Sequence, residues 1–221
     1  MNARETNSAA RGFEAVLSDM DGVLVDTSDQ HHRVMRRWAQ RHRLDPEDVI
    51  RAPQGVRNRD FIRELAPGAS VDRELDVIAS WANTESHDVS ALPGADELLR
   101  GVLTSAPTAV VTSSSAATAR QRLAVAGLRT PLVLVTSENV IHGKPDPEGY
   151  FLAAKLLRVD ITRCLVIEDS PAGLEAGVAT GATVAALRTT HRDDELKGAH
   201  LVDESIAGVA RQLGWSDANR R

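Results

Sequence analysis

The stretch from Phe13 to Thr27, FEAVLSDMDGVLVDT, places two aspartates two positions apart directly after a short apolar run. Such a run, closed by a glycine-containing turn, is typical of a buried strand in a parallel sheet. Asp19 and Asp21 would then lie at the carboxyl end of that strand, where open α/β sheets bind ligands. One carboxylate can attack or bind a metal while the other transfers a proton, because two close acids do not both ionise easily. An acidic turn that caps the next helix would give the same pattern.

From about residue 95 onward, strand-like and helix-like segments alternate along the chain. This alternation predicts a doubly wound parallel sheet with helices on both faces, a Rossmann-like α/β fold. Strands are expected at 108–111, 132–135, 164–167 and 183–187, with a short edge strand near 200–202, and helices at 116–126, 147–157 and 172–180, with one more helix closing the chain.

Residues 28–92 interrupt the alternation with helical patterns and no convincing strand. The segment ends at Leu92-Pro93-Gly94, a hinge-like sequence. We therefore expect a small helical domain inserted after the first strand. The predicted division is 12–27 and 93–214 for the core, 28–92 for the inserted domain, and 1–11 and 215–221 for flexible tails.

Composition narrows the class of protein. The net charge of −5, without a basic block, argues against a nucleic-acid partner. No run of eighteen apolar residues is present, so no membrane association is expected. The polar amino terminus does not look like a signal peptide, and the single cysteine, Cys164, lies in an apolar run that predicts burial. These features predict a cytoplasmic protein.

Three more polar segments follow predicted strands. Thr112 and the three serines after it combine hydroxyls with free helix amides, which suits phosphate, although an ordinary helix cap would look alike. Lys144, between Gly143 and Pro145, is a compact cation suited to phosphate, or else a surface lysine in a turn. Glu168 and Asp169 offer hard oxygen ligands suited to Mg²⁺, although Asp169 could simply cap a helix. The order of all four segments indicates one shared site.

The stretches DMDGVLVDT, VVTSSS, HGKPDPEGY and CLVIEDSPAGLEAG together resemble the four motifs of the haloacid dehalogenase superfamily in order and spacing. The resemblance runs from about Phe13 to Leu213. Within the superfamily, the chain resembles the phosphatases in which a small helical cap is inserted after the first motif. Among these it is most similar to sugar-phosphate and glycerol-phosphate phosphatases, and it is also similar to β-phosphoglucomutase. The resemblance implies a core with an inserted α-helical cap.

The resemblance also implies roles for individual residues. Asp19 would be the nucleophile that forms an aspartyl-phosphate, and Asp21 the general acid/base. Thr112 and Lys144 would hold the transferring phosphoryl group. The implied Mg²⁺ ligands are Asp19, Asp169 and the backbone carbonyl of Asp21, with Glu168 as a further ligand or an outer group.

Other positions are candidates for contact with substrate. The sugar-phosphate members often carry a histidine near His31, and Ser113 follows Thr112 in the second motif. Arg57 and Arg59 could reach a substrate hydroxyl or a second anionic group, or could be solvated. His32 is expected at the surface, and Trp38 and Trp81 in the core of the cap.

The expected function is Mg²⁺-dependent hydrolysis of a small sugar or polyol phosphate by a monomer or weak homodimer. A β-phosphoglucomutase-like phosphotransferase is the alternative, but the mutases carry a Lys-Asn pair where this chain has Ser115 and Ala116. A metal-free dehalogenase is disfavoured because those relatives lack the second acid that Asp21 supplies. A catalytically silent binding protein is disfavoured by the complete set of motif residues. Ser18, in place of an apolar residue before the nucleophile, is expected to alter packing and not chemistry.

Overall fold

The structure, a computed structural model, describes residues 12–51 and 55–215 of the chain. The tail predicted at 1–11 lies outside these ranges, and so does the tail predicted at 215–221 except for its first residue, Trp215. Trp215, at the edge of the described chain, packs edge-on against Phe13 with the ring centroids 6.4 Å apart.

The core is a six-stranded sheet in which every strand pairs in parallel with its neighbours, in the order β5-β4-β1-β6-β7-β8. The central strands β1 and β6 are buried over their whole length, and they are apolar up to their last residues, Ser18 and Glu168, as the sequence of a two-sided parallel sheet requires. This is the predicted doubly wound α/β fold. The strands are β1 (Ala15–Ser18), β4 (Thr108–Val111), β5 (Val133–Val135), β6 (Cys164–Glu168), β7 (Thr183–Leu187) and β8 (Leu201–Asp203).

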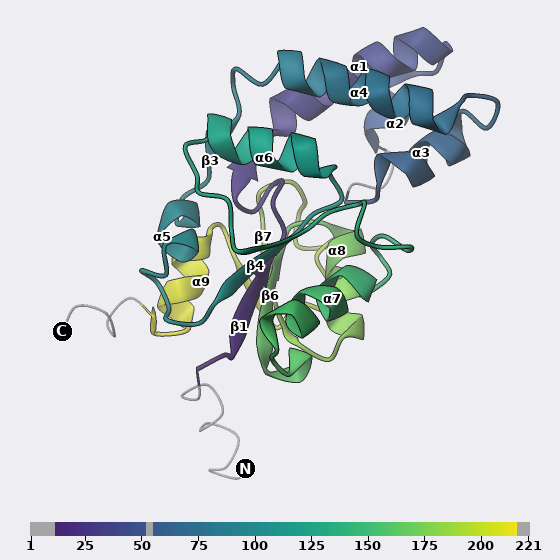
Figure 1. The fold of residues 1–221 in the computed structure, drawn as a ribbon. Helices are drawn as coiled ribbons and strands as arrows, with labels where there is room; N and C mark the ends of the chain where they lie inside the picture. Colours follow the sequence, from purple (N-terminus) through teal and green to yellow (C-terminus); the bar gives the residue numbers. More distant parts are fainter. Residues whose placement is uncertain (1–11, 52–54, 216–221) are drawn as a thin grey trace.

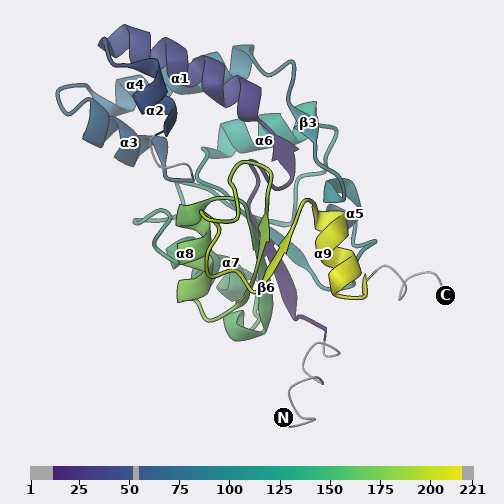
Figure 2. The same cartoon turned by 180° about the vertical axis from the view of Figure 1, so that it is seen from behind.

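Helices cover both faces of this sheet (Figures 1 and 2). Alternate side chains of β1 point to opposite layers: Val16 packs in one apolar cluster, and Ala15 and Leu17 in the other. The Val16 layer is covered by α5 (Ala95–Leu99), α6 (Ala116–Val125) and α9 (Ile206–Gln212), and the Leu17 layer by α7 (Glu148–Leu157) and α8 (Pro171–Ala179), with a short 3₁₀ helix at Ile161–Arg163.

The helical insertion stands over the carboxyl ends of the core strands (Figure 1). It has an apolar cluster of its own, in which Trp38 is fully buried and Trp81 partly buried. The insertion contains α1 (Ser28–His42), α2 (Pro46–Arg51), α3 (Asn58–Leu65) and α4 (Val71–Thr84).

A two-stranded antiparallel ribbon joins the cap to the core. β2 (Val25–Asp26) carries the chain out of the first motif and β3 (Ser90–Ala91) brings it back. The sequence predicts no strand within 28–92, because two residues are too few to give a hydrophobic alternation. Among the described helices, none is both long and apolar enough to cross a bilayer.

Candidate active site

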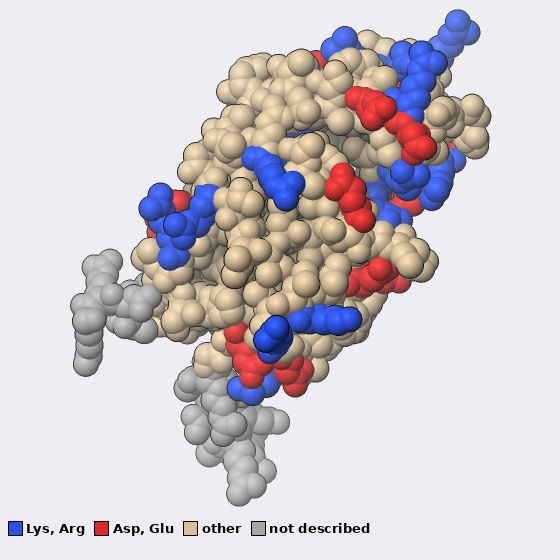
Figure 3. Space-filling view, viewed as in Figure 1, with Lys and Arg blue, Asp and Glu red and all other residues tan. Residues whose placement is uncertain are grey.

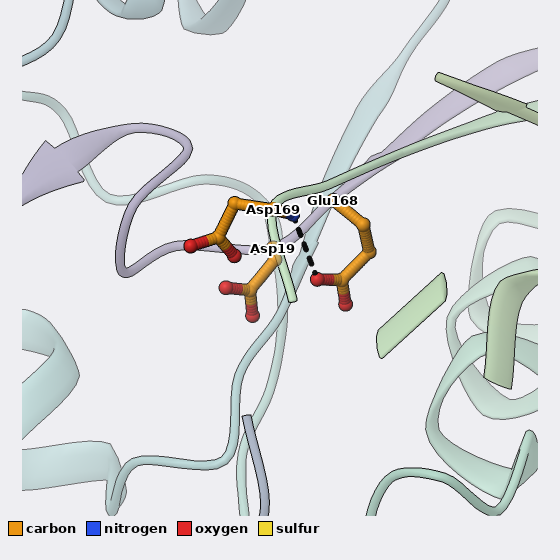
Figure 4. A group of neighbouring side chains, drawn as sticks. All are labelled: Asp19, Glu168 and Asp169. Atoms are coloured by element: carbon orange, nitrogen blue, oxygen red, sulfur yellow. Dashed lines mark hydrogen bonds between the residues drawn. The ribbon is translucent and has the colours of Figure 1, made fainter. Parts of the chain in front are cut away.

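Strand register brings the first and fourth motifs together. Ser18 of β1 pairs with Ile167 of β6, and the Asp19 amide donates to the Ile167 carbonyl at 2.9 Å. The next residues on both strands are therefore neighbours. Figure 4 shows Asp19, Glu168 and Asp169 gathered at these two strand ends, with the carboxylates of Asp19 and Asp169 side by side.

Lys144 is buried beside these acids and is not a surface lysine. Its Nζ lies 2.5 Å from Asp19 Oδ1 and 2.6 Å from Glu168 Oε1. Burial raises the pKa of Asp19 to about 7, against the opposing charge of Lys144. Burial by itself would lower the pKa of Lys144. The negative charges of Asp19 and Glu168 have a larger effect in the opposite direction and hold this pKa above its ordinary value, so the ammonium stays charged.

Three buried acids lie close enough to bind one cation. Asp19, Glu168 and Asp169 each offer an oxygen within 4.8 Å of the others. Burial, and then the charges of Asp19 and Glu168, raise the pKa of Asp169 well above its ordinary value. One lysine does not neutralise three buried carboxylates, so a divalent cation with oxygen ligands fits this donor set.

The two acids of the fourth motif differ in their surroundings. Glu168 Oε1 accepts from Tyr150 at 2.5 Å as well as contacting Lys144, and Oε2 accepts from the Asp169 amide and the Ser170 hydroxyl at 3.2 and 3.3 Å. The cap of α8 is Ser170, whose Oγ accepts from the Gly173 amide, so Asp169 is not needed as a helix cap.

Asp169 is held by residues that the sequence motifs do not include. The Thr190 hydroxyl donates to the Asp169 carboxylate, and His191 Nδ1 lies 3.0 Å from the Asp169 carbonyl oxygen. On its other side, a Cβ at Gly22 (φ +78°) would collide with Asp169 Oδ2. Thr190 and His191 follow β7, the next strand of the sheet, and that position is the only sequence signal that could have pointed to them.

Asp21 contacts a different set of partners. Its carboxylate accepts from Thr27 Oγ1 at 3.2 Å, from Ser114 Oγ at 3.1 Å and from Arg122 Nη1 at 2.8 Å. Arg122 is not among the residues predicted from the sequence, because it lies mid-helix in α6 and outside the motifs. Its spacing of seven from the N-cap Ser115 places both on one helix face, which is a weak signal.

The hydroxyl groups of the second motif, at positions 112–115, make different contacts. Thr112 lines the cavity, and its Oγ1 accepts from the Ser114 amide at 3.1 Å. Ser113 donates to the Gly55 carbonyl oxygen of the cap at 2.5 Å. Ser115 supplies the helix cap, since its Oγ accepts from the Thr118 amide. Thr112 and Ser114 therefore both face the site, Ser114 through its contact with Asp21.

A cavity of about 790 Å³ lies between the cap and the strand ends. His31 and His32 both line it, so His32 is half-buried and the expectation of a surface position is wrong. Both lie near the start of α1, which begins beside the cavity with Ser28 in its lining. Burial, and then the charge of Arg122, lower the pKa of His31 to about 4, which keeps the ring neutral near pH 7. The cavity floor is lined by Asp19, Asp21, Thr112 and Asp169.

The two candidate arginines of the cap are already paired. Arg57 is buried, donates to Asp60 Oδ2 at 2.8 Å and to the Val140 carbonyl oxygen at 3.2 Å, and packs its stem over Gly143. Arg59 pairs with Asp72 at 2.9 Å. Arg57 thus fastens the cap to the core at the edge of the cavity.

The chain matches the model of the haloacid dehalogenase-like hydrolases over residues 13–181, and it belongs to this family. It is 38% identical to hexitol phosphatase A of Escherichia coli, over 90% of this chain and 93% of the relative. It is 34% identical to a phosphorylated carbohydrates phosphatase of Thermotoga maritima, over 76% of this chain and 82% of the relative.

The chain is also similar to the solved structure of a putative β-phosphoglucomutase from Thermotoga maritima, with a TM-score of 0.68 and 30% identity over 90% of this chain and 99% of that one. The prediction of a haloacid dehalogenase-superfamily phosphatase is confirmed by the family and by its named relatives. The choice between hydrolysis and mutase chemistry depends on the site.

Proposed function

We propose that this phosphatase hydrolyses the monophosphate ester of a small sugar or polyol, with Mg²⁺, through an aspartyl-phosphate on Asp19. The observation that carries the proposal is the buried contact of Lys144 with Asp19, which lies beside Asp169 on the floor of the cavity under the cap. An aspartate in this setting can approach a phosphate only where cations offset the combined negative charge.

Asp19, Asp169 and the backbone carbonyl of Asp21 would hold the Mg²⁺. When bound, this ion offsets charge on the phosphoryl oxygens. Glu168, with both oxygens already bonded, is assigned to holding Lys144 in place. Of the two acids of the fourth motif, Asp169 would therefore bind the metal and Glu168 would bind Lys144.

In the first half of the reaction, an Asp19 oxygen bonds to phosphorus while the bond from phosphorus to the leaving oxygen breaks. Asp21 gives its proton to that oxygen as the alcohol leaves. In the second half, water attacks the aspartyl-phosphate, Asp21 takes a proton from the water, and the bond to Asp19 breaks. Lys144 and Thr112 hold the phosphoryl group throughout.

The cavity lining supports a substrate with one phosphate and a neutral body. Each arginine of the described lining is paired with a carboxylate: Arg57 with Asp60, Arg59 with Asp72, and Arg122 with Asp21. A mutase must hold a bisphosphate in two orientations and needs a second anion site. Paired arginines supply such a site poorly, so water is expected to take the phosphoryl group.

Hydroxyl groups of a sugar or polyol suit the remaining polar lining. Asp76, Glu138 and the neutral His31 can bond hydroxyls, and the named relatives act on hexitol and carbohydrate phosphates. Lys, Arg, Asp and Glu side chains are interspersed on the face in Figure 3, in keeping with a small-molecule partner. The cytoplasmic location and the monomeric or weakly dimeric state stay predictions.

The test is phosphate release with Mg²⁺ from a panel of hexitol, hexose and glycerol phosphates. We expect hydrolysis of hexitol or hexose monophosphates without an isomerised product. In a second arm, β-glucose 1-phosphate is supplied with a trace of glucose 1,6-bisphosphate. Glucose 6-phosphate forming much faster than free phosphate would favour the mutase over the phosphatase, and no turnover in either arm would favour a silent binding protein.

A further inference from the structure

Asp21 is oriented by a side chain from a distant part of the core. Arg122 Nη1 donates to Asp21 Oδ1 at 2.8 Å and to Ser114 Oγ at 3.1 Å, while Ser114 Oγ donates to Asp21 Oδ2 at 3.1 Å. Both carboxylate oxygens are therefore bonded within one small network. The Arg122 side chain is only 12% exposed, so solvent screens this ion pair weakly.

The same guanidinium also reaches the cap. Arg122 Nε donates to Gln30 Oε1 at 2.9 Å, and Gln30 Nε2 donates to the Ala82 carbonyl oxygen at 2.7 Å. Gln30 lies in α1 and Ala82 in α4, and Gln30 is 1% exposed. A continuous chain of hydrogen bonds thus runs from two cap helices through Arg122 to Asp21.

We propose that Arg122 is a positioning residue that couples the seating of the cap to the orientation of Asp21. The inference rests on the proposed function, because Asp21 must transfer protons for its orientation to matter. Arg122 itself exchanges no proton and is assigned no contact with a reacting atom. The hydrogen bond from Arg122 Nε to Gln30 fixes the orientation of the guanidinium, and the guanidinium in that orientation donates from Nη1 to Asp21.

The planar guanidinium is what allows one side chain to serve both ends of the chain of hydrogen bonds. Its N–H groups point outward in a fixed fork, so a bond on the Nε edge sets the direction of the Nη1 bond. A lysine carries a single ammonium and cannot transmit an orientation in this way. We therefore expect Arg122→Lys to keep the charge and lose the coupling.

The test uses p-nitrophenyl phosphate, because nitrophenolate leaves without needing a proton whereas the attack of water still needs Asp21. Wild-type enzyme is compared with Arg122→Lys, Arg122→Met and Gln30→Met by rapid mixing. Arg120→Met is the matched control, since Arg120 is an exposed arginine of the same helix. Thermal unfolding of every variant identifies any that fail to fold. If Arg122→Met fails to fold, Arg122→Lys still tests the inference.

We expect first-turnover release of nitrophenolate to stay within about threefold of wild type in the Arg122 variants. The steady-state kcat should fall by about 10- to 100-fold, because positioned proton transfer contributes about 10²–10⁴-fold. KM should fall with it, so that kcat/KM, which reports formation of the aspartyl-phosphate, stays close to the wild-type value. On a hexitol phosphate, both halves of the reaction should slow. Equal losses in the first turnover and the steady state, or a change confined to KM, would overturn the inference.

A double-variant cycle tests the link to the cap. If Gln30 acts through Arg122, Gln30→Met combined with Arg122→Met should lower kcat no further than Arg122→Met alone. Losses that multiply would show that the two residues act independently, and would overturn the coupling. Wild-type enzyme without activity on any phosphomonoester would instead overturn the proposed function itself, so the two failures are distinguishable.

Discussion

Asp19 and Lys144 make the shortest contact between buried opposite charges at the strand ends, 2.5 Å from oxygen to nitrogen. The candidate nucleophile, Asp19, is thus paired with a charged lysine that also contacts Glu168. Two aspartates and a glutamate around one ammonium leave an excess of negative charge. At the scale of single residues, this group of side chains therefore carries negative charge that a bound cation would offset.

Asp19→Asn should reduce turnover by roughly a thousandfold or more while the fold persists, because the amide keeps the shape of the side chain and loses the attacking charge. Phosphate release and thermal unfolding measure the two effects. Asp26→Asn, at an exposed aspartate of β2, is the control and should retain activity. Normal turnover in Asp19→Asn would remove Asp19 from the mechanism.

The second residue-scale prediction concerns the metal and needs no turnover. Mg²⁺ should raise the melting temperature of the wild-type protein relative to the protein in chelator, because an ion that binds the folded state stabilises it. Asp169→Asn should abolish most of that increase, since it removes a buried ligand beside Asp19. An undiminished Mg²⁺-dependent shift in Asp169→Asn would place the ion elsewhere.

At the scale of elements, a buried acid joins two helices of the cap. Glu74 of α4 accepts from Trp38 Nε1 at 3.1 Å, from Arg41 at 3.2 Å and from His42 Nε2 at 2.8 Å, all on α1. Burial would raise the pKa of Glu74, but hydrogen bonds from His42 and Arg41 lower it below its ordinary value. Helices α1 and α4 are thereby joined by a charge as well as by apolar packing.

Glu74→Gln should lower the free energy of unfolding by about 1–3 kcal/mol at pH 7, because it leaves buried donors with a weaker acceptor. The lowered pKa means that the wild-type contribution is present above about pH 4.5 and is lost as the pH falls through the folded-state value. The difference between variant and wild type should therefore shrink on acidification. Urea unfolding at several pH values measures it, with the exposed Glu64→Gln as control. If the difference in the free energy of unfolding between Glu74→Gln and wild type does not change with pH, the ionised carboxylate of Glu74 is not what stabilises the cap.

At the scale of the whole molecule, the cap touches the core beside the site as well as through its hinge ribbon. Ser113 of the core donates to the Gly55 carbonyl oxygen, and a Cβ at Gly55 (φ +86°) would collide with Ser170 Oγ. Arg57 reaches across to Val140 nearby. The cavity between cap and core depends on this close approach of two parts that fold around separate apolar clusters.

Gly55→Ala should hold the cap away from the core, because the new methyl group meets Ser170 and the backbone conformation disfavours a side chain. We expect kcat/KM to fall by about tenfold or more, since water then enters the site, with a stability loss of about 1 kcal/mol. Gly68→Ala is the matched control, because no atom lies within 4 Å of its added Cβ. Equal kinetics in the two variants would show that this contact does not seat the cap.

Local patterns in the sequence were enough to predict the sheet, most of the inserted helices and the motif residues at the strand ends. Apolar runs specify buried strands, and the residue that follows each run must lie at the same edge of a parallel sheet. For that reason the sequence by itself determined that Asp19, Thr112 and Asp169 share one site.

Only the tertiary structure decided which side chains surround those residues. Arg122 lies 101 positions from Asp21, and Thr190 lies 21 positions from Asp169, so no local pattern links either pair. Arg57 looked free in the sequence, but the docked cap places it against Val140 and Asp60. Secondary structure follows from neighbours along the chain, whereas these contacts follow from how α6, β7 and the cap pack against the strand ends.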